Sequence, residues 1–290
     1  MSLFSIAALQ LALPRADNRD LLERETESVI RAFPRTRMVV FPELASFGPA
    51  VEAAETMPGP TEERYRALAR KHRIWLIPGS LYERAGEDVY NTAPVIDPGG
   101  EVVARYRKMY PFLPYEKGIT PGAEFVVFDV PDAGRFGLSI CYDQWVPETT
   151  RAIVWKGAEA IIHPTMTGTI DRPLELVLAR ANAIANQCYF ADVNAAGELG
   201  KGSSIVVGPE GEVLHESGAT AESIAFTIDF DRVRRVRRGG TLQLGQILKS
   251  FRDTPVEYPC YRGTYERSES LAALGALEIV NRDEDSGPAQ

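Results

Sequence analysis

Short apolar runs alternate with longer stretches of mixed polarity along most of the chain. Residues 3–11 (LFSIAALQL) and 38–41 (MVVF) are typical of buried strands, and the charged stretch 19–33 between them predicts a helix. The same alternation predicts further strands at residues 75–83, 91–97, 101–108, 134–140, 159–164, 189–194, 203–217 and 223–230, and further helices at 61–72, 148–156, 174–186 and 229–238. This order of elements indicates an α/β protein.

Turn residues indicate how some of these strands are connected. The sequences DPGG at residues 97–100 and PEG at 209–211 each predict a tight turn between two antiparallel strands. Hairpins of this kind, together with strand–helix–strand units, predict mixed sheets layered with helices. No Ser- or Gly-rich linker divides the chain, so we predict one domain over residues 1–262. Residues 263–290 then form a C-terminal extension whose polar end we expect to be loose.

Composition narrows the possible partners. The 290 residues are 44% hydrophobic and 25% charged, as in ordinary soluble globular proteins. A net charge of −8 argues against nucleic acid or an anionic membrane as the main partner. No apolar run approaches the roughly 20 residues of a membrane span, and the N-terminal residues show no basic leader of a secretory signal.

Cysteine content predicts the compartment. Three cysteines, at positions 141, 188 and 260, are too few and too scattered for a disulfide framework or a zinc site. A reducing cytoplasm is therefore the expected location.

Three residues whose side chains could take part in catalysis stand at the end of a predicted strand or just after one. Glu43 follows residues 38–41, Lys108 ends residues 101–108, and Cys141 follows residues 134–140. Side chains at strand ends can converge at one edge of a sheet. An acid–base group, a fixed cation and a nucleophile are what acyl transfer requires, so the sequence predicts an enzyme.

Each of these residues also has a structural interpretation. Cys141, at a strand-to-helix turn, is either a thiolate favoured by backbone N–H groups or an inert buried thiol. Glu43 is either a general base whose pKa is raised by desolvation or an exposed loop carboxylate. Lys108 and Glu116, which lies in a loop stiffened by prolines, could both be surface residues. Cys188 is expected in the core, and the sequence around Cys260 indicates no particular role for it.

Two other chemistries are possible. Histidine is the usual partner of a nucleophilic cysteine, and of His72, His163 and His215 only His163 ends a strand from which it could reach Cys141. A Cys-His hydrolase is therefore an alternative. The basic run 231–238 could bind anions, but its arginines fall on several sides of one short helix, which favours a solvated helix.

The motifs together resemble one family. They are FPE at residues 41–43, YRK at 106–108, a PxxPxE loop ending at Glu116, and CYDxWxPE at 141–148. In this order they resemble the nitrilase, or carbon–nitrogen hydrolase, superfamily over residues 3–261. The resemblance implies a four-layer α-β-β-α sandwich that dimerises through its helices and needs no cofactor. It further implies that Cys141 is the nucleophile, Glu43 the general base and Lys108 the electrostatic clamp.

The resemblance also suggests the reaction. Glu116 would orient the substrate as in amidases of the superfamily, and the backbone N–H of Tyr142 would help to hold the oxyanion. Tyr142 and Asp143 stand where nitrilases carry Trp-Glu, which makes a nitrile substrate less favoured. We therefore expect hydrolysis of a small amide with release of ammonia. An N-carbamoyl amine or amino acid is the alternative substrate, and a catalytically silent scaffold the non-enzymatic one. Candidate pocket residues are Tyr142, Trp145, Thr165, Met166 and Thr167.

Overall fold

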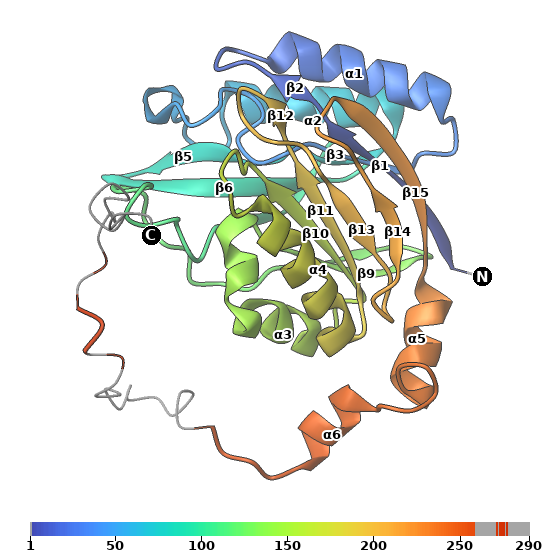
Figure 1. Ribbon diagram of the computed structural model, residues 1–290. Coiled ribbons are helices and arrows are strands. Elements are labelled where there is room, and N and C mark those ends of the chain that lie inside the picture. Colours follow the sequence, from blue (N-terminus) through green and yellow to red (C-terminus); the bar gives the residue numbers. More distant parts are fainter. Residues whose placement is uncertain (1, 259–270, 272, 276, 278–290) are drawn as a thin grey trace, which may run out of the picture.

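Two mixed β-sheets form the centre of the computed structural model, which describes residues 2–258, 271, 273–275 and 277 (Figure 1). The first sheet has the order β15-β1-β3-β4-β6-β5, with β7 also paired to β6. Its strands are β1 (Leu3–Gln10), β3 (Met38–Val40), β4 (Trp75–Ile77), β5 (Leu81–Ala85), β6 (Asp88–Ile96), β7 (Val102–Arg107) and β15 (Glu222–Asp229). In this sheet β1 pairs in parallel with β3 and antiparallel with β15, where Leu3 lies opposite Asp229.

The second sheet has the order β14-β13-β11-β10-β9-β8. Its strands are β8 (Val127–Val130), β9 (Gly134–Leu138), β10 (Ala160–Thr165), β11 (Tyr189–Asn194), β13 (Ile205–Val207) and β14 (Val213–Glu216). A parallel pair of very short strands, β2 (Ala12–Leu13) and β12 (Ala196–Gly197), connects residues that follow β1 and β11.

Burial divides the molecule into layers. The two sheets face one another across a core to which β1 contributes Phe4 and Ile6, β9 contributes Phe136 and β10 contributes Ile162. Alternate residues of each strand face the opposite side, as the two-residue period of a strand requires.

Helices cover the outer face of each sheet. On the first sheet, Leu22 of α1 (Arg19–Ala32) and Tyr65 of α2 (Pro60–His72) pack with residues of β1, β3 and β4. On the second sheet, Ile153 of α3 (Pro147–Trp155) and Ala183 of α4 (Arg172–Asn186) pack on β10 and β11. The order of layers is helix, sheet, sheet, helix (Figure 1), which confirms the predicted α/β sandwich.

Some local predictions differ from the structure. The predicted strand at 75–83 is two strands, because the chain turns at residues 78–80, where Gly79 adopts φ +66°. Strand β8 and helix α6 (Ile247–Asp253) were not predicted. Cys260 and half of the apolar stretch at residues 271–280, whose spacing is that of a helix, lie outside the described residues. None of the described helices is long and apolar enough to cross a membrane.

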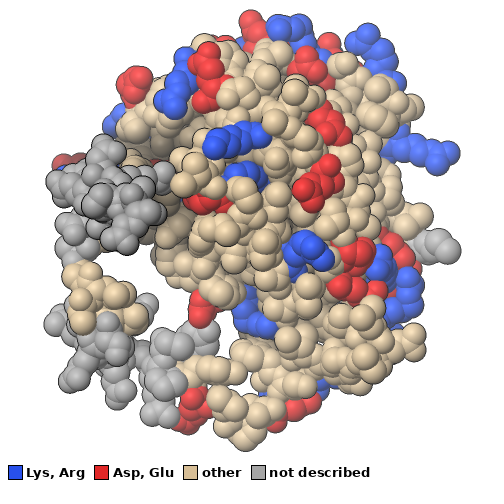
Figure 2. Space-filling model, viewed as in Figure 1, with Lys and Arg blue, Asp and Glu red and all other residues tan. Residues whose placement is uncertain are grey.

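The arginine-rich run forms α5 (Phe230–Gly239), as predicted, but several of its arginines are engaged by the protein. Arg232 pairs with Glu210 at 2.9 Å, and Arg234 pairs with Glu159 at 2.8 Å. These arginines therefore fasten α5 to the sheets. On the face shown in Figure 2, acidic and basic side chains are interspersed.

Candidate active site

A cavity of about 750 Å³ opens where strand ends of the two sheets meet. It contains Glu43, Lys108, Glu116 and Cys141, which are far apart in the sequence. Its wall also includes Tyr82, Phe112, Tyr115, Tyr142, Met166, Thr167, Leu174, Glu175 and Leu199. The structure thus brings together all four residues that the sequence motifs singled out.

Each of the four residues is placed by the end of a strand or by a loop that follows one. Glu43 comes three residues after β3, and its backbone N–H donates to the carbonyl of Thr165 at the end of β10, at 3.3 Å. Lys108 follows β7, and its backbone donates to the carbonyl of Asn91 and accepts from Gly122, both at 2.8 Å. Glu116 lies in the loop between β7 and β8.

Lys108 is buried between two carboxylates. Its Nζ donates to Glu43 Oε1 at 2.9 Å and to Glu116 Oε2 at 2.7 Å. The Lys108 and Glu43 side chains are 1% and 2% exposed, and that of Glu116 is 16% exposed. Asn91 Nδ2 also donates to Glu43 Oε1, at 2.8 Å. The two carboxylates therefore fix the position of the Lys108 ammonium, and its burial excludes water that could take over its role as their partner.

The surroundings shift the pKa values of this group in directions that suit proton transfer. Burial raises the pKa of Glu43, and the nearby Glu116 adds to this, although Lys108 opposes it. Burial alone would lower the pKa of Lys108, but Glu43, Cys141 and Glu116 together raise it well above its ordinary value. Glu43 is therefore a carboxylate that can accept and return a proton, while Lys108 keeps its charge.

Cys141 begins a short 3₁₀ helix, η2 (Cys141–Trp145), and adopts a left-handed backbone conformation with φ +46°. Burial raises the pKa of its thiol well above the ordinary value, Glu43 raises it further, and Lys108 lowers it. The turn therefore does not favour a free thiolate, which was one of the two alternatives from the sequence. A neutral thiol next to a carboxylate needs that carboxylate as its base during attack.

The sequence analysis missed Glu175 and Arg172, which lie near the sulfur beside the predicted pocket residue Thr167. Thr167 Oγ1 lies 3.7 Å from Cys141 Sγ and 3.1 Å from Glu175 Oε1. Arg172 Nη1 donates to Glu175 Oε2 at 2.8 Å. Burial, followed by the charge of Asp192, raises the pKa of Glu175 to about 7. The sequence signal that could have placed Glu175 near the site is its position near the start of a helix that follows a strand end.

The predicted pocket residues divide into two sets. Tyr142, Met166 and Thr167 line the cavity, and the ring of Tyr142 packs against Phe112 with centroids 4.9 Å apart. Trp145 and Thr165, though described, do not line it. In a 3₁₀ helix residues three apart lie on one side, so Trp145 packs on Tyr142 and its Nε1 lies 3.4 Å from Glu175 Oε1. Thr165 is fully buried within β10.

His163 does not line the cavity, although it is described and fully buried. Its Nδ1 lies 2.7 Å from Ser139 Oγ, and its ring packs against Phe190. Burial lowers the pKa of His163 to about 4. This environment disfavours the Cys-His alternative. Among the residues that the structure describes, no group of three or more His, Cys, Asp or Glu side chains is arranged to hold a metal ion.

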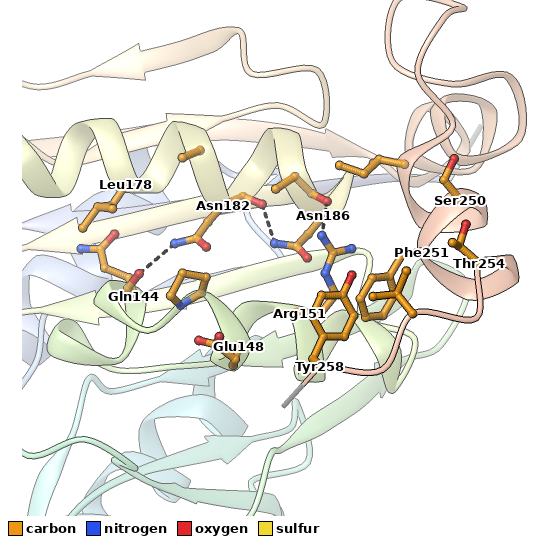
Figure 3. Close-up of a pocket in the computed structure, with 15 residues that line it drawn as sticks. Gln144, Glu148, Arg151, Leu178, Asn182, Asn186, Ser250, Phe251, Thr254 and Tyr258 are labelled. Atoms are coloured by element: carbon orange, nitrogen blue, oxygen red, sulfur yellow. Dashed lines mark hydrogen bonds between the residues drawn. The ribbon is translucent and has the colours of Figure 1, made fainter. Parts of the chain in front are cut away.

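A separate cavity of about 570 Å³ lies between α3, α4 and α6 (Figure 3). Asn182 Nδ2 donates to the carbonyl of Gln144 at 3.1 Å, and Asn186 Nδ2 donates to the carbonyl of Asn182 at 2.9 Å. The apolar part of this cavity includes Leu178 and Phe251. Its described lining includes neither Cys141 nor Lys108, so the chemistry belongs to the first cavity.

Comparison with known proteins identifies the family. Residues 5–238 match the family model described as carbon-nitrogen hydrolase. The chain belongs to this family. It is therefore a hydrolase of carbon–nitrogen bonds other than peptide bonds.

Similar sequences and structures are consistent with this assignment. Omega-amidase NIT2 of Homo sapiens is 32% identical over 203 residues, which are 64% of this chain and 73% of that protein. Formamidase of Bacillus cereus (strain Q1) is 29% identical over 232 residues, 75% of this chain and 69% of that protein. The carbon–nitrogen hydrolase of Helicobacter pylori G27 has a TM-score of 0.77 at 28% identity, covering 88% of this chain and 96% of that chain.

An amidase from Nesterenkonia sp. is also similar, with a TM-score of 0.72 at 27% identity over 81% of this chain and 94% of that one. A mutant of that amidase was solved with acrylamide added to its active-site cysteine. In that relative, therefore, a small amide reaches the cysteine of the site.

Proposed function

We propose that this carbon–nitrogen hydrolase cleaves a small linear amide through a thioester on Cys141 and releases ammonia. The observation that carries the proposal is the placement of Lys108 between Glu43 and Glu116, in the same cavity as the Cys141 thiol. The names of the similar omega-amidase, formamidase and amidase support an amide as substrate.

Each group has one task in the first half of the reaction. Glu43 takes the thiol proton while sulfur attacks the amide carbonyl and the C–S bond forms. Lys108 and the backbone N–H of Tyr142 stabilise the negative charge that develops on the carbonyl oxygen. Glu116 accepts a hydrogen bond from the substrate NH₂ and so fixes the direction of attack.

The second half regenerates the enzyme. The protonated Glu43 returns its proton to the departing nitrogen as the C–N bond breaks, and ammonia leaves. Glu43 then takes a proton from water, which attacks the thioester. As the C–S bond breaks, the carboxylic acid leaves and Glu43 returns the proton to sulfur, which restores the thiol and the Glu43 carboxylate. A carboxyl group whose pKa is raised by burial can act both as acid and as base near neutral pH.

An N-carbamoyl amine or amino acid is the second candidate substrate. Its terminal carbamoyl NH₂ could meet Glu116 in the same way. A cavity of about 750 Å³ has room for a longer group than a formyl or acetyl chain. A nitrile is less favoured, and a silent scaffold would not need all of Glu43, Lys108 and Cys141.

The test is ammonia release from a panel of short amides, N-carbamoyl compounds and nitriles. We expect turnover of amides by the wild-type chain and none by Cys141→Ala, with an unchanged circular dichroism spectrum. Cys188→Ala is the matched control, because Cys188 is a fully buried thiol in the core and should leave turnover intact. Full activity of Cys141→Ala, or turnover of nitriles alone, would contradict the proposal.

The expected homodimer is also a proposal, with a second copy of this chain as the partner. The outer helices α3 and α4 expose Trp155, Leu174 and Val177, which are 60%, 56% and 64% exposed. Exposed apolar side chains on neighbouring helices are typical of a subunit interface. Sedimentation velocity at micromolar concentration should give the mass of a dimer, and a monomer would contradict this. The cytoplasmic location stays a prediction.

A further inference from the structure

Asp143 is a buried carboxylate next to the nucleophile for which the reaction above has no use. It lies two residues after Cys141 in η2, is fully buried, and does not line the cavity. Burial raises its pKa to about 6, so at neutral pH it is mainly ionised. A buried charge needs hydrogen-bond donors around it, and the identity of these donors indicates what Asp143 does.

Three donors converge on this carboxylate. The backbone N–H of Ile140 donates to Oδ2 at 2.8 Å, and the hydroxyl of Tyr106 donates to the same oxygen at 2.7 Å. The backbone N–H of Tyr110 donates to Oδ1 at 2.9 Å. All three partners are donors, so the carboxylate is the form that this site accepts.

The donors belong to the two halves of the active site. Ile140 directly precedes Cys141, after β9 of the second sheet. Tyr106 and Tyr110 stand two residues before and two residues after Lys108, at the end of β7 of the first sheet. One carboxylate therefore joins the turn that carries the nucleophile to the strand end that carries the cation.

The same carboxylate closes the nucleophile turn itself. The N–H of Asp143 donates to the carbonyl of Ile140 at 3.0 Å, while the Ile140 N–H donates to the Asp143 side chain. Cys141, between them, is held at φ +46°, a conformation that a non-glycine residue adopts at a cost. Both contacts fix Cys141 in this conformation.

We propose that Asp143 is a positioning residue that sets the distance between the Cys141 sulfur and the Lys108 ammonium. This inference depends on the proposed amide hydrolysis, in which Lys108 must stand next to the oxygen of the carbonyl that sulfur attacks. A misplacement of about 1 Å at such a site can cost about 10²-fold in rate. Asparagine at 143 would turn an NH₂ group toward one of the three donors.

The sharpest test is Tyr106→Phe, which removes one donor and keeps the shape of the ring. Its matched control is Tyr189→Phe. Tyr189 is also a buried tyrosine of the central core, and its hydroxyl accepts from the backbone N–H of Asp229. It begins β11, whereas the cavity is near the other end of that strand, beside Asn194 and Thr167.

We expect Tyr106→Phe to lower kcat about tenfold or more with KM changed less than about twofold, while Tyr189→Phe keeps both. Because Lys108 lowers the pKa of the Cys141 thiol, we also expect slower alkylation of Cys141 by iodoacetamide in Tyr106→Phe. Asp143→Asn should lower both kcat and the rate of Cys141 alkylation further than Tyr106→Phe does, provided that its circular dichroism shows a folded chain.

The two proposals fail in different ways. If no amide is turned over by the wild-type chain, the proposed function fails, and the alkylation rate alone decides the role of Asp143. If amides are turned over and Tyr106→Phe matches Tyr189→Phe in kcat and in alkylation rate, the Asp143 proposal is wrong.

Discussion

Replacing Lys108 by methionine removes the positive charge that lies between Glu43 and Glu116. Both carboxylates are within 2.9 Å of the ammonium, and the Lys108 side chain is only 1% exposed, so water cannot take its place. Removing one partner of a buried ion pair leaves an unpaired charge, which typically costs about 3–5 kcal/mol. We therefore expect Lys108→Met to lower the free energy of unfolding by about that amount.

The same change removes a donor to the developing oxyanion. Loss of one such donor typically lowers kcat by about 10²–10³. We expect at least this loss in ammonia release from the best amide substrate, measured at saturating substrate. Urea unfolding followed by circular dichroism gives the stability change.

A double variant separates stability from catalysis. Lys108→Met combined with Glu116→Gln removes one of the two facing carboxylates, so it should regain part of the lost stability but none of the lost activity. Lys156→Met is the control, because Lys156 is an exposed lysine bonded to the carbonyl of Phe125 at 2.8 Å. It should change stability by about 0.5 kcal/mol or less. The reasoning would be refuted if Lys108→Met were as stable and as active as the wild type.

Three other residues give further predictions. The pKa of His163 is lowered to about 4 in the folded chain, against an ordinary value of 6.5. The unfolded chain therefore binds more protons between these two pH values, and the free energy of unfolding should fall by up to about 3 kcal/mol as the pH drops from 6.5 to 4. In urea unfolding, His163→Asn should show a weaker dependence of this free energy on pH. The same dependence as in the wild type would contradict the argument. Gly79 has φ +66°, and a Cβ there would lie 1.7 Å from the carbonyl oxygen of Pro42. Gly79→Ala should therefore lower the melting temperature, and it should also lower the activity because Pro42 directly precedes Glu43. Unchanged values in both assays would count against this. Burial raises the pKa of Cys188 to about 12, so mass spectrometry should find no alkylation of Cys188 in the folded chain, and prompt labelling would show that this part of the core opens.

The sequence predicted which residues meet in one cavity because the motif residues stand at the ends of recognisable strands. Glu43, Lys108 and Cys141 each end or follow a run whose strand character the structure shows, and the residues just after β3, β7 and β9 line one cavity between the two sheets. The proline-bracketed loop likewise indicated that Glu116 would be held in place.

The residues that support this site could not be predicted in the same way. Asp143 and Glu175 contact partners from other elements, such as Tyr106 and Trp145, and no local pattern records such contacts. The place of Trp145 depended on η2 being a 3₁₀ helix, in which its ring packs on Tyr142; Tyr142 and Glu175 line the cavity and Trp145 does not.

The antiparallel pairing of β1 with β15 determines when this enzyme can fold during synthesis. Leu3 and Gln10 lie opposite Asp229 and Glu222. The first strand of the chain can therefore complete its pairing only after a segment more than 200 residues downstream has been synthesised. Contacts of such long sequence separation slow folding, because a long loop must close before they form. A ribosome-bound chain that stops before residue 222 leaves the edge of β1 unpaired, and we expect such a nascent fragment to depend on chaperones.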